Sequence, residues 1–148
     1  MTTAASVSLA AVTSAALIAS YCDIRFRTIP QWLVAFTSLA GLAAQTLASG
    51  WHGLFHAVEA GAFAFLILGV MYLAGVMGAG DVKLFAAISC AVGTSGLWAF
   101  ARITGLLGAL LAVFYLAVGA GRGGVRRTGL PYGVAIGAAG VITLVWFR

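Results

Sequence analysis

The sequence predicts an all-α polytopic membrane protein, a six-transmembrane-helix bundle that forms a single domain over residues 1–148. Of its 148 residues, 63% are hydrophobic and 7% are charged, and the mean hydropathy is +1.11. A soluble domain carries about 25% charged residues on its water-facing surface. The eight basic and three acidic residues leave six uncharged windows of 18 or more residues, and a helix of roughly 20 residues crosses a bilayer. Six such spans leave no room for a separate soluble domain.

Each span is expected to be a helix, because unpaired backbone polar groups cannot face lipid. The residues before the first span, 1–3, lack the positive charge of a secretory signal peptide, so this span is expected to be retained. Pairs of glycines in the fifth and sixth spans, Gly105 with Gly108 and Gly133 with Gly137, predict close helix packing. The expected spans are 4–21, 32–48, 54–77, 82–100, 103–120 and 130–147.

The basic residues predict the orientation of the chain in the cell membrane. Loops 22–31, 78–83 and 121–129 fall on one side of the bilayer, and only Arg102 and Arg148 fall on the other. Cytoplasmic loops are enriched in Lys and Arg, so both termini are expected outside the cell. Because the net charge of +5 is scattered between apolar spans, no nucleic-acid partner is expected. The basic residues of the three loops are Arg25, Arg27, Lys83, Arg122, Arg126 and Arg127.

Two of the three acids are expected to meet at the cytoplasmic face. Asp23 ends the first span, and Asp81 lies between the third and fourth. Each also suits a structural role: Asp23 can pair with Arg27, and Asp81 can cap the fourth span. Two carboxyl groups in one poorly hydrated site would share a proton, so that one activates water while the other protonates a carbonyl. This aspartic-protease chemistry needs no metal or cofactor, and Gly78 and Gly80 would leave room for a substrate backbone.

Three segments resemble the motifs of a known family. The segment Gly-Ala-Gly-Asp at 78–81 resembles the GxGD motif of intramembrane aspartic proteases, and its extension Val-Lys-Leu through residue 84 narrows the resemblance to the type IV prepilin peptidases. The segment from Asp23 to Pro30 is similar to the family's first-aspartate segment. The segment Leu-Pro-Tyr-Gly-Val-Ala-Ile at 130–136 is similar to its final-helix motif.

The resemblance implies that Asp23 and Asp81 form a catalytic pair that cleaves a short basic leader from prepilins and pseudopilins. These substrates have an apolar helix in the membrane and are cut at the cytoplasmic face after a glycine, and the pilus or secretion machinery would be a partner. Gln31 stands where the family often has Asn. The chain lacks the paired CxxC motifs of the members that also methylate the product, and it resembles the minimal peptidases of tight-adherence (Tad/Flp) pilus systems.

Several other residues are candidates for binding substrate or shaping the site. Lys83 and Arg25 are membrane anchors by the positive-inside rule, and either could instead position an acidic group of the substrate. Pro131 suits the first turn of the last helix, and it could also shape the helix end beside the site. Tyr132 and Gly133 follow it in the final-helix motif.

The remaining acid belongs to a different region. His52, His56 and Glu59 share one face of a helix and include metal-ligating side chains. In a continuous helix, however, Glu59 would lie ~33 Å from Asp81, so these residues are expected at the membrane interface rather than in the catalytic site. Cys22 and Cys90 are expected neither to pair nor to bind zinc.

Two other kinds of protein remain open from the residues alone. A small proton-coupled transporter also places acids within its spans. A non-enzymatic membrane protein of a pilus assembly would use the two aspartates only as helix caps. Acids at one membrane face favour the protease, because a transporter is expected to have them near the middle of the bilayer.

Overall fold

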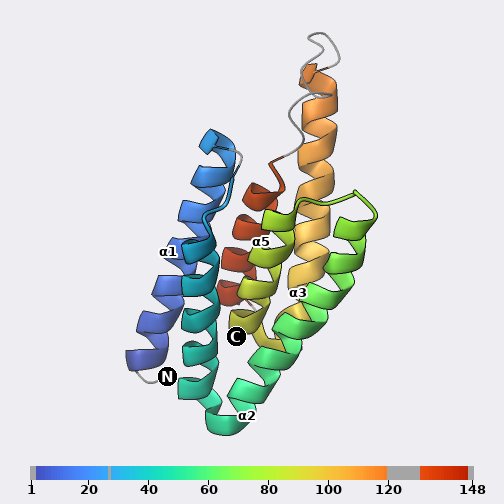
Figure 1. Cartoon of the computed structure of the whole chain (residues 1–148). Helices are drawn as coiled ribbons and strands as arrows, with labels where there is room; N and C mark the ends of the chain where they lie inside the picture. The colour runs from blue at the N-terminus through green and yellow to red at the C-terminus, as the bar shows by residue number, and fades with distance from the viewer. Residues whose placement is uncertain (1–2, 27, 120–130, 147–148) are drawn as a thin grey trace.

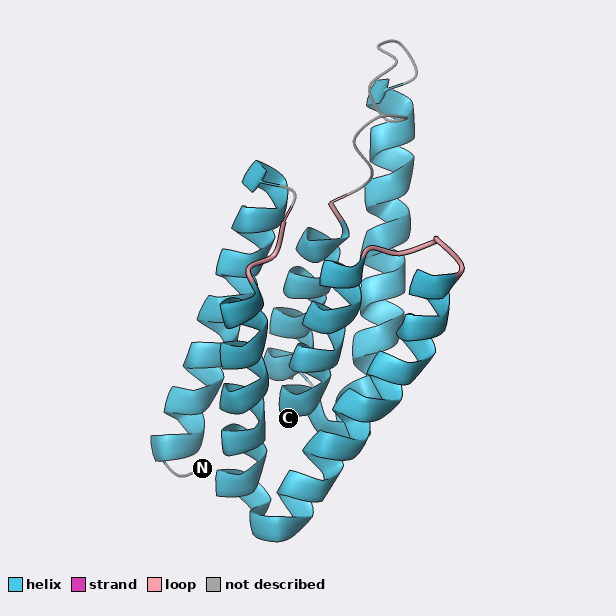
Figure 2. Ribbon diagram, in the orientation of Figure 1, coloured by secondary structure: helices cyan, strands magenta, loops and turns pink. Residues whose placement is uncertain are grey.

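The described part of the chain is entirely helical apart from its connections. The computed structural model describes residues 3–26, 28–119 and 131–146. Within these residues four helices follow one another and no strand occurs, so the predicted all-α class is confirmed (Figures 1 and 2). The helices are α1 (Thr3–Phe26), α2 (Gln31–Leu73), α3 (Ala79–Gly119) and α5 (Tyr132–Trp146).

The predicted number of six helices was wrong for the described residues, because α2 and α3 each cover two expected spans. The expected loop at 49–53 is a kink in α2, and the expected loop at 101–102 is helical. In α2 only Ser49 and Gly50 leave helical geometry, and Gly50 has a positive φ of 60°. In α3 the break falls at Gly93, with a φ of 69°, which glycine adopts without strain. Arg102, expected in a loop, lies inside α3, and its Nε donates to the carbonyl oxygen of Trp98 at 3.2 Å. The charge of Arg102 therefore does not mark a loop at which the chain reverses direction.

Both kinks fold their helices back on themselves. The 43 residues of α2 would measure ~65 Å if straight, about twice the ~30 Å hydrocarbon core of a bilayer. Figure 1 shows α2 as a V, whose first arm is 31–48 and whose second arm is 51–73. In α3, Phe85 and Phe100 lie on opposite sides of the kink and stack with ring centroids 4.3 Å apart. The two arms of α3 therefore also pack against each other.

Side chains of α2 hold the α3 kink in place. A helix break leaves carbonyl oxygens without intrahelical partners, and the Nε2 of Gln45 donates to the Ala91 carbonyl at 2.7 Å. The hydroxyl of Thr94 lies 3.1 Å from Nδ1 of His56. A Cβ at Gly93 would lie 3.0 Å from the Gln45 amide nitrogen, so the glycine also makes room for this contact.

Replacing Gln45 with leucine is expected to destabilise the bundle by about 1–3 kcal/mol, because the Ala91 carbonyl would lose its donor. Thermal unfolding of the purified protein in detergent would report the change. Thr46→Val is the control, since the Thr46 hydroxyl binds only the Leu42 carbonyl of its own helix. A Gln45→Leu protein as stable as Thr46→Val would show that the contact contributes little.

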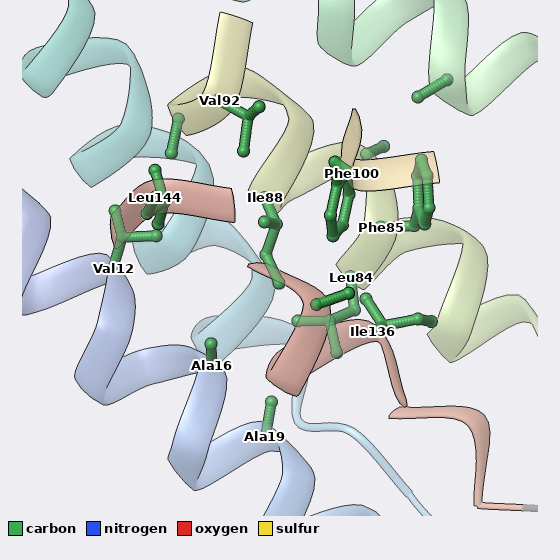
Figure 3. Close-up of a cluster of buried hydrophobic side chains, with 14 of the residues drawn as sticks. Val12, Ala16, Ala19, Leu84, Phe85, Ile88, Val92, Phe100, Ile136 and Leu144 are labelled. Atoms are coloured by element: carbon green, nitrogen blue, oxygen red, sulfur yellow. The ribbon is translucent and has the colours of Figure 1, made fainter. Parts of the chain in front are cut away.

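The core lies where α5 packs against α1 and α3 (Figures 1 and 3). Glycines bring these helices close together, as the sequence predicted for Gly108, Gly133 and Gly137. The prediction was wrong for Gly105, since a Cβ there would have no neighbour within 4 Å. A Cβ at Gly137 would meet the Ser20 hydroxyl of α1. A Cβ at Gly108 of α3 would lie 2.8 Å from the ring of Tyr132. The large core side chains come from all four helices and include Val12, Leu33, Leu84, Phe85, Ile88, Phe100, Ile136 and Leu144.

The connection 28–30 and the turn 74–78 lie at one end of the bundle, and both ends of the described chain lie toward the other (Figure 1). The windows Leu9–Phe26, Gln31–Leu73 and Ala79–Ala117 are long and apolar enough to cross a membrane, and α5 is a shorter apolar helix. These helices indicate an integral membrane protein. The loop predicted at 121–129 lies outside the described residues.

Candidate active site

A cavity of about 340 Å³ opens at the end of the bundle that holds the connection 28–30 and the turn 74–78. It lies among the end of α1, the start of α2 and the start of α3. Asp23 and Asp81 both line it, so the predicted meeting of the two acids is found in the structure. The other lining residues are Thr28, Ile29, Gln31, Val34, Gly78, Ala79, Gly80 and Lys83.

Asp23 is held by the first turn of another helix. The sequence predicted it at the end of a span, whereas α1 continues to Phe26 and places Asp23 on its inward face, 8% exposed. Its Oδ2 accepts a hydrogen bond from the Gly133 amide of α5 at 2.9 Å. First-turn amides have no intrahelical acceptor, and Pro131, which precedes α5, has no side-chain acceptor to offer. Asp23 thus supplies a helix cap from a different helix, while Arg27, its predicted partner, lies outside the described residues.

Gly133 allows this contact because it has no side chain. A Cβ at this position would lie 2.8 Å from Oδ2 of Asp23 and 3.0 Å from its Cγ. The hydroxyl of Ser20, one turn before Asp23 on α1, donates to the Ala16 carbonyl at 2.9 Å and to the Gly133 carbonyl at 3.3 Å. Both backbone polar groups of Gly133 therefore contact α1, and the start of α5 fixes where the Asp23 carboxylate lies.

Asp81 lies in the first turn of α3 rather than capping it as predicted. The amide of Val82 donates to the Gly78 carbonyl at 3.2 Å, so Gly78 is the cap and Asp81 is the third helical residue. The Asp81 carboxylate in turn accepts from the Gly78 backbone amide, as the acidic member of a capping box does. A Cβ on Gly78 would lie 3.0 Å from Oδ2 of Asp81. The turn at 78–81 therefore fixes the second carboxylate at the cavity wall.

Comparison with known proteins identifies the family of the chain. Residues 10–121 match the model of the type IV leader peptidase family. The chain belongs to this family. The matched range contains Asp23, Asp81 and the whole of α2. No curated protein and no solved structure matches the chain significantly.

Some of the other residues predicted to bind substrate or shape the site line the cavity, and others do not. Lys83 lines the cavity and its Nζ donates to Oε1 of Gln31 at 3.4 Å. Arg25 is exposed, with its guanidinium 6.0 Å from the ring of Phe26. Pro131 is buried and Tyr132 is half-buried. Of these four described residues, only Lys83 is among those that line the cavity.

Sequence reasoning missed three cavity residues that join α1 to α2. Thr28, Ile29 and Gln31 line the cavity together with the 78–81 turn, and Ile29 lies against Gly80 of this turn. Ile29 and Gln31 flank the proline of the first-aspartate segment, so their position in that motif was the available signal. Thr28 carries no comparable signal.

The histidines and the third acid lie outside the cavity that holds Asp23 and Asp81, as predicted. His56 pairs with Glu59 through Nδ1 and Oε2 at 3.7 Å, and both side chains are well exposed. Among the described residues, no group of three or more His, Cys, Asp or Glu side chains could hold a metal ion.

The cavity has the parts that acid–base hydrolysis needs. Two carboxyl groups from α1 and α3 face one partly enclosed space and interact electrostatically. Each is held by a backbone amide, that of Gly133 or Gly78. Such a pair can take one proton from a water molecule and give another to a substrate carbonyl.

Proposed function

We propose that this protein is an intramembrane aspartic endopeptidase that removes the basic leader from type IV prepilins or pseudopilins. Its membership in the type IV leader peptidase family supports a peptidase of this kind. The observation that carries the proposal is that Asp23 and Asp81, from helices far apart in the sequence, line one cavity at the end of the bundle.

In the proposed mechanism Asp23 and Asp81 hold a water molecule between them. One carboxylate accepts a proton from the water as its oxygen attacks the scissile carbonyl carbon, and the other, protonated, donates to the carbonyl oxygen. The carboxyl group that took the proton from water then gives it to the amide nitrogen, and the C–N bond breaks to release an amine. As the carbonyl re-forms, a hydroxyl of the tetrahedral intermediate returns its proton to the other carboxylate. Water is thereby added across the peptide bond, with no metal or cofactor in any step.

The substrate backbone is proposed to lie along the 78–81 turn. This turn forms one wall of the cavity and Gln31 lies on another. Lys83 adds a positive charge at the rim, which suits a carbonyl or an acidic group of the bound chain. Before substrate binds, the two carboxyl groups can lie farther apart than catalysis requires. They would close around the water molecule when substrate enters the cavity.

The cavity is proposed to open at the cytoplasmic face of the cell membrane, with both termini outside. The sequence predicts most basic residues in loops on one side of the bilayer, which the positive-inside rule assigns to the cytoplasm. Of these residues, Lys83 lines the cavity and Arg25 lies two residues after Asp23. In this arrangement each arm of α2 and of α3 crosses the bilayer separately. Partner proteins would be the pilin precursor and the pilus or secretion machinery.

The direct test is to co-express the protein with a prepilin and to determine the mass and N-terminus of the product. Processing at a single site at the end of the leader is expected. A transporter would instead give ion-dependent uptake in vesicles and leave the precursor intact, and a purely structural assembly protein would do neither. Either result would contradict the proposal.

The two cavity glycines are expected to respond differently to alanine. A Cβ at Gly78 would displace the Asp81 carboxylate, whereas a Cβ at Gly80 would only touch Ile29 at an ordinary 3.7 Å. Gly78→Ala should lower kcat/KM for the precursor by roughly tenfold or more, since catalysis is sensitive to small misplacements. Gly80→Ala should cause a clearly smaller loss in the same assay, and equal losses would show that displacement of Asp81 is not the cause.

A further inference from the structure

A second hollow joins the candidate active site and runs away from it between α2 and α3. It has a volume of about 420 Å³ and shares Val34 and Lys83 with the active-site cavity. We call it the α2/α3 groove. The hydrogen bond from Lys83 to Gln31, at 3.4 Å, lies at the junction. The two hollows therefore meet at Val34 and Lys83, and Lys83 is two residues from Asp81 in the chain.

The groove runs along the helix axes. Its residues on the first arm of α2, Val34, Ser38 and Leu42, are four apart and share one helix face. On α3 it extends from Lys83 to Cys90. The wall is therefore ~10–12 Å long at 1.5 Å per residue, which is about two turns of helix. This direction and length suit a helix packed alongside.

The groove lining is mostly apolar and therefore favours an apolar occupant. The Ser38 hydroxyl already donates to the Val34 carbonyl at 3.0 Å, and Lys83 is the single charged residue among the described lining residues. Lys83 lies at the end of the groove that adjoins the active-site cavity. The occupant is therefore expected to be apolar along the groove and polar beside Lys83. A chain with this pattern is a membrane helix that continues into an extended polar segment.

Small residues in the groove lining permit close helix packing. Gly61 lies against Cys90, whose sulfur a Cβ at position 61 would overlap. Ala62 is an exposed alanine of the second arm that lines the groove. In lipid, helices associate through close packing rather than hydrophobic burial, and small residues permit that approach. Backbone polar groups in lipid must also be paired, so a peptide segment entering the groove would be helical.

We propose that the α2/α3 groove binds an apolar transmembrane helix of the substrate, the one directly joined to the bond cleaved in the cavity. The inference rests on the proposed function and adds to it a binding site for the part of the substrate that stays in the membrane. The groove aligns this helix so that its end beside Lys83 delivers the adjoining backbone to Asp81.

The test compares two substrates that share one cleavage site. The first is a precursor with its apolar helix, reconstituted with the protein in phospholipid vesicles, and the second is a soluble peptide without the helix. Ala62→Phe fills the groove and should lower the ratio of kcat/KM for precursor to that for peptide by roughly tenfold or more, through a higher KM for the precursor. Ala43→Phe is the matched control, because Ala43 is an exposed alanine of α2 outside the described groove lining and should leave the ratio unchanged.

The outcomes separate this inference from the proposed function. If the unmodified protein cleaves neither substrate, the proposed function fails. If it cleaves both and the ratio is unchanged in Ala62→Phe, the groove holds lipid or nothing and the inference is overturned. A change of oligomeric state in Ala62→Phe would assign the groove to a second copy of the chain. Should Ala62→Phe fail to accumulate, Val58→Trp adds bulk to the same lining and is held to the same criterion.

Discussion

Replacing either Asp23 or Asp81 with asparagine is expected to abolish precursor processing. Asparagine has nearly the same shape as aspartate, but it can neither accept a proton from water nor donate one to a carbonyl as a carboxylic acid does. General acid–base catalysis contributes ~10²–10⁴-fold to a rate, and here one pair would supply both functions. Each variant should therefore process precursor at least about 10³-fold more slowly, measured as kcat/KM with the purified protein.

The third acid provides a matched control for these variants. Glu59 is exposed and pairs with His56 away from the cavity, so Glu59→Gln should process precursor at nearly the normal rate. In Asp23→Asn the side-chain oxygen can still accept from the Gly133 amide, and the fold should be kept. Equal thermal stability of the variants would confirm that chemistry was removed rather than structure. Processing at the normal rate by Asp23→Asn or Asp81→Asn would refute the acid pair.

The juxtaposition of the two acids could be predicted because it depends on chain reversals that the sequence marks. Two expected spans lie between the segment around Asp23 and the segment around Asp81. In an up-and-down bundle both segments therefore lie at the same end, and the cavity is found there. The breaks inside α2 and α3 were not predicted correctly. Arg102 indicated a loop because charge is costly in lipid, yet it lies on an exposed helix face, and the actual break is at Gly93.

The support of the acids could not be derived from local sequence. The bond between Asp23 and Gly133 joins α1 to the last helix, and it exists only because Ser20, Gly133 and Gly137 let these helices pack closely. The resemblance implied that Gly133 shapes the site, but spacing alone gave no partner for it. For Asp81 the predicted role as the cap of the helix was wrong: Gly78 is the cap, and Asp81 lies in the first turn.

Substituting Gly133 with alanine is expected to impair catalysis more than folding. The new methyl group would lie 2.8 Å from Oδ2 of Asp23, so either the carboxylate or the start of α5 must move. Overpacking of this size costs about 1–3 kcal/mol of stability. A misplacement near 1 Å can reduce a rate by about 10²-fold, so kcat/KM for precursor should fall by that order while the protein still folds.

Gly140→Ala separates the loss of packing from the displacement of Asp23. Gly140 lies on the same helix, and its Cβ would also lie 2.8 Å from a neighbour, in this case Cγ2 of Ile88 in the core. Both variants should lower the unfolding temperature in detergent by similar amounts, because each adds one methyl group to a close helix contact. Only Gly133→Ala should also lose most of its kcat/KM. If the two variants lose activity in proportion to their loss of stability, α5 merely packs against α1, and the Gly133 amide does not position the carboxylate.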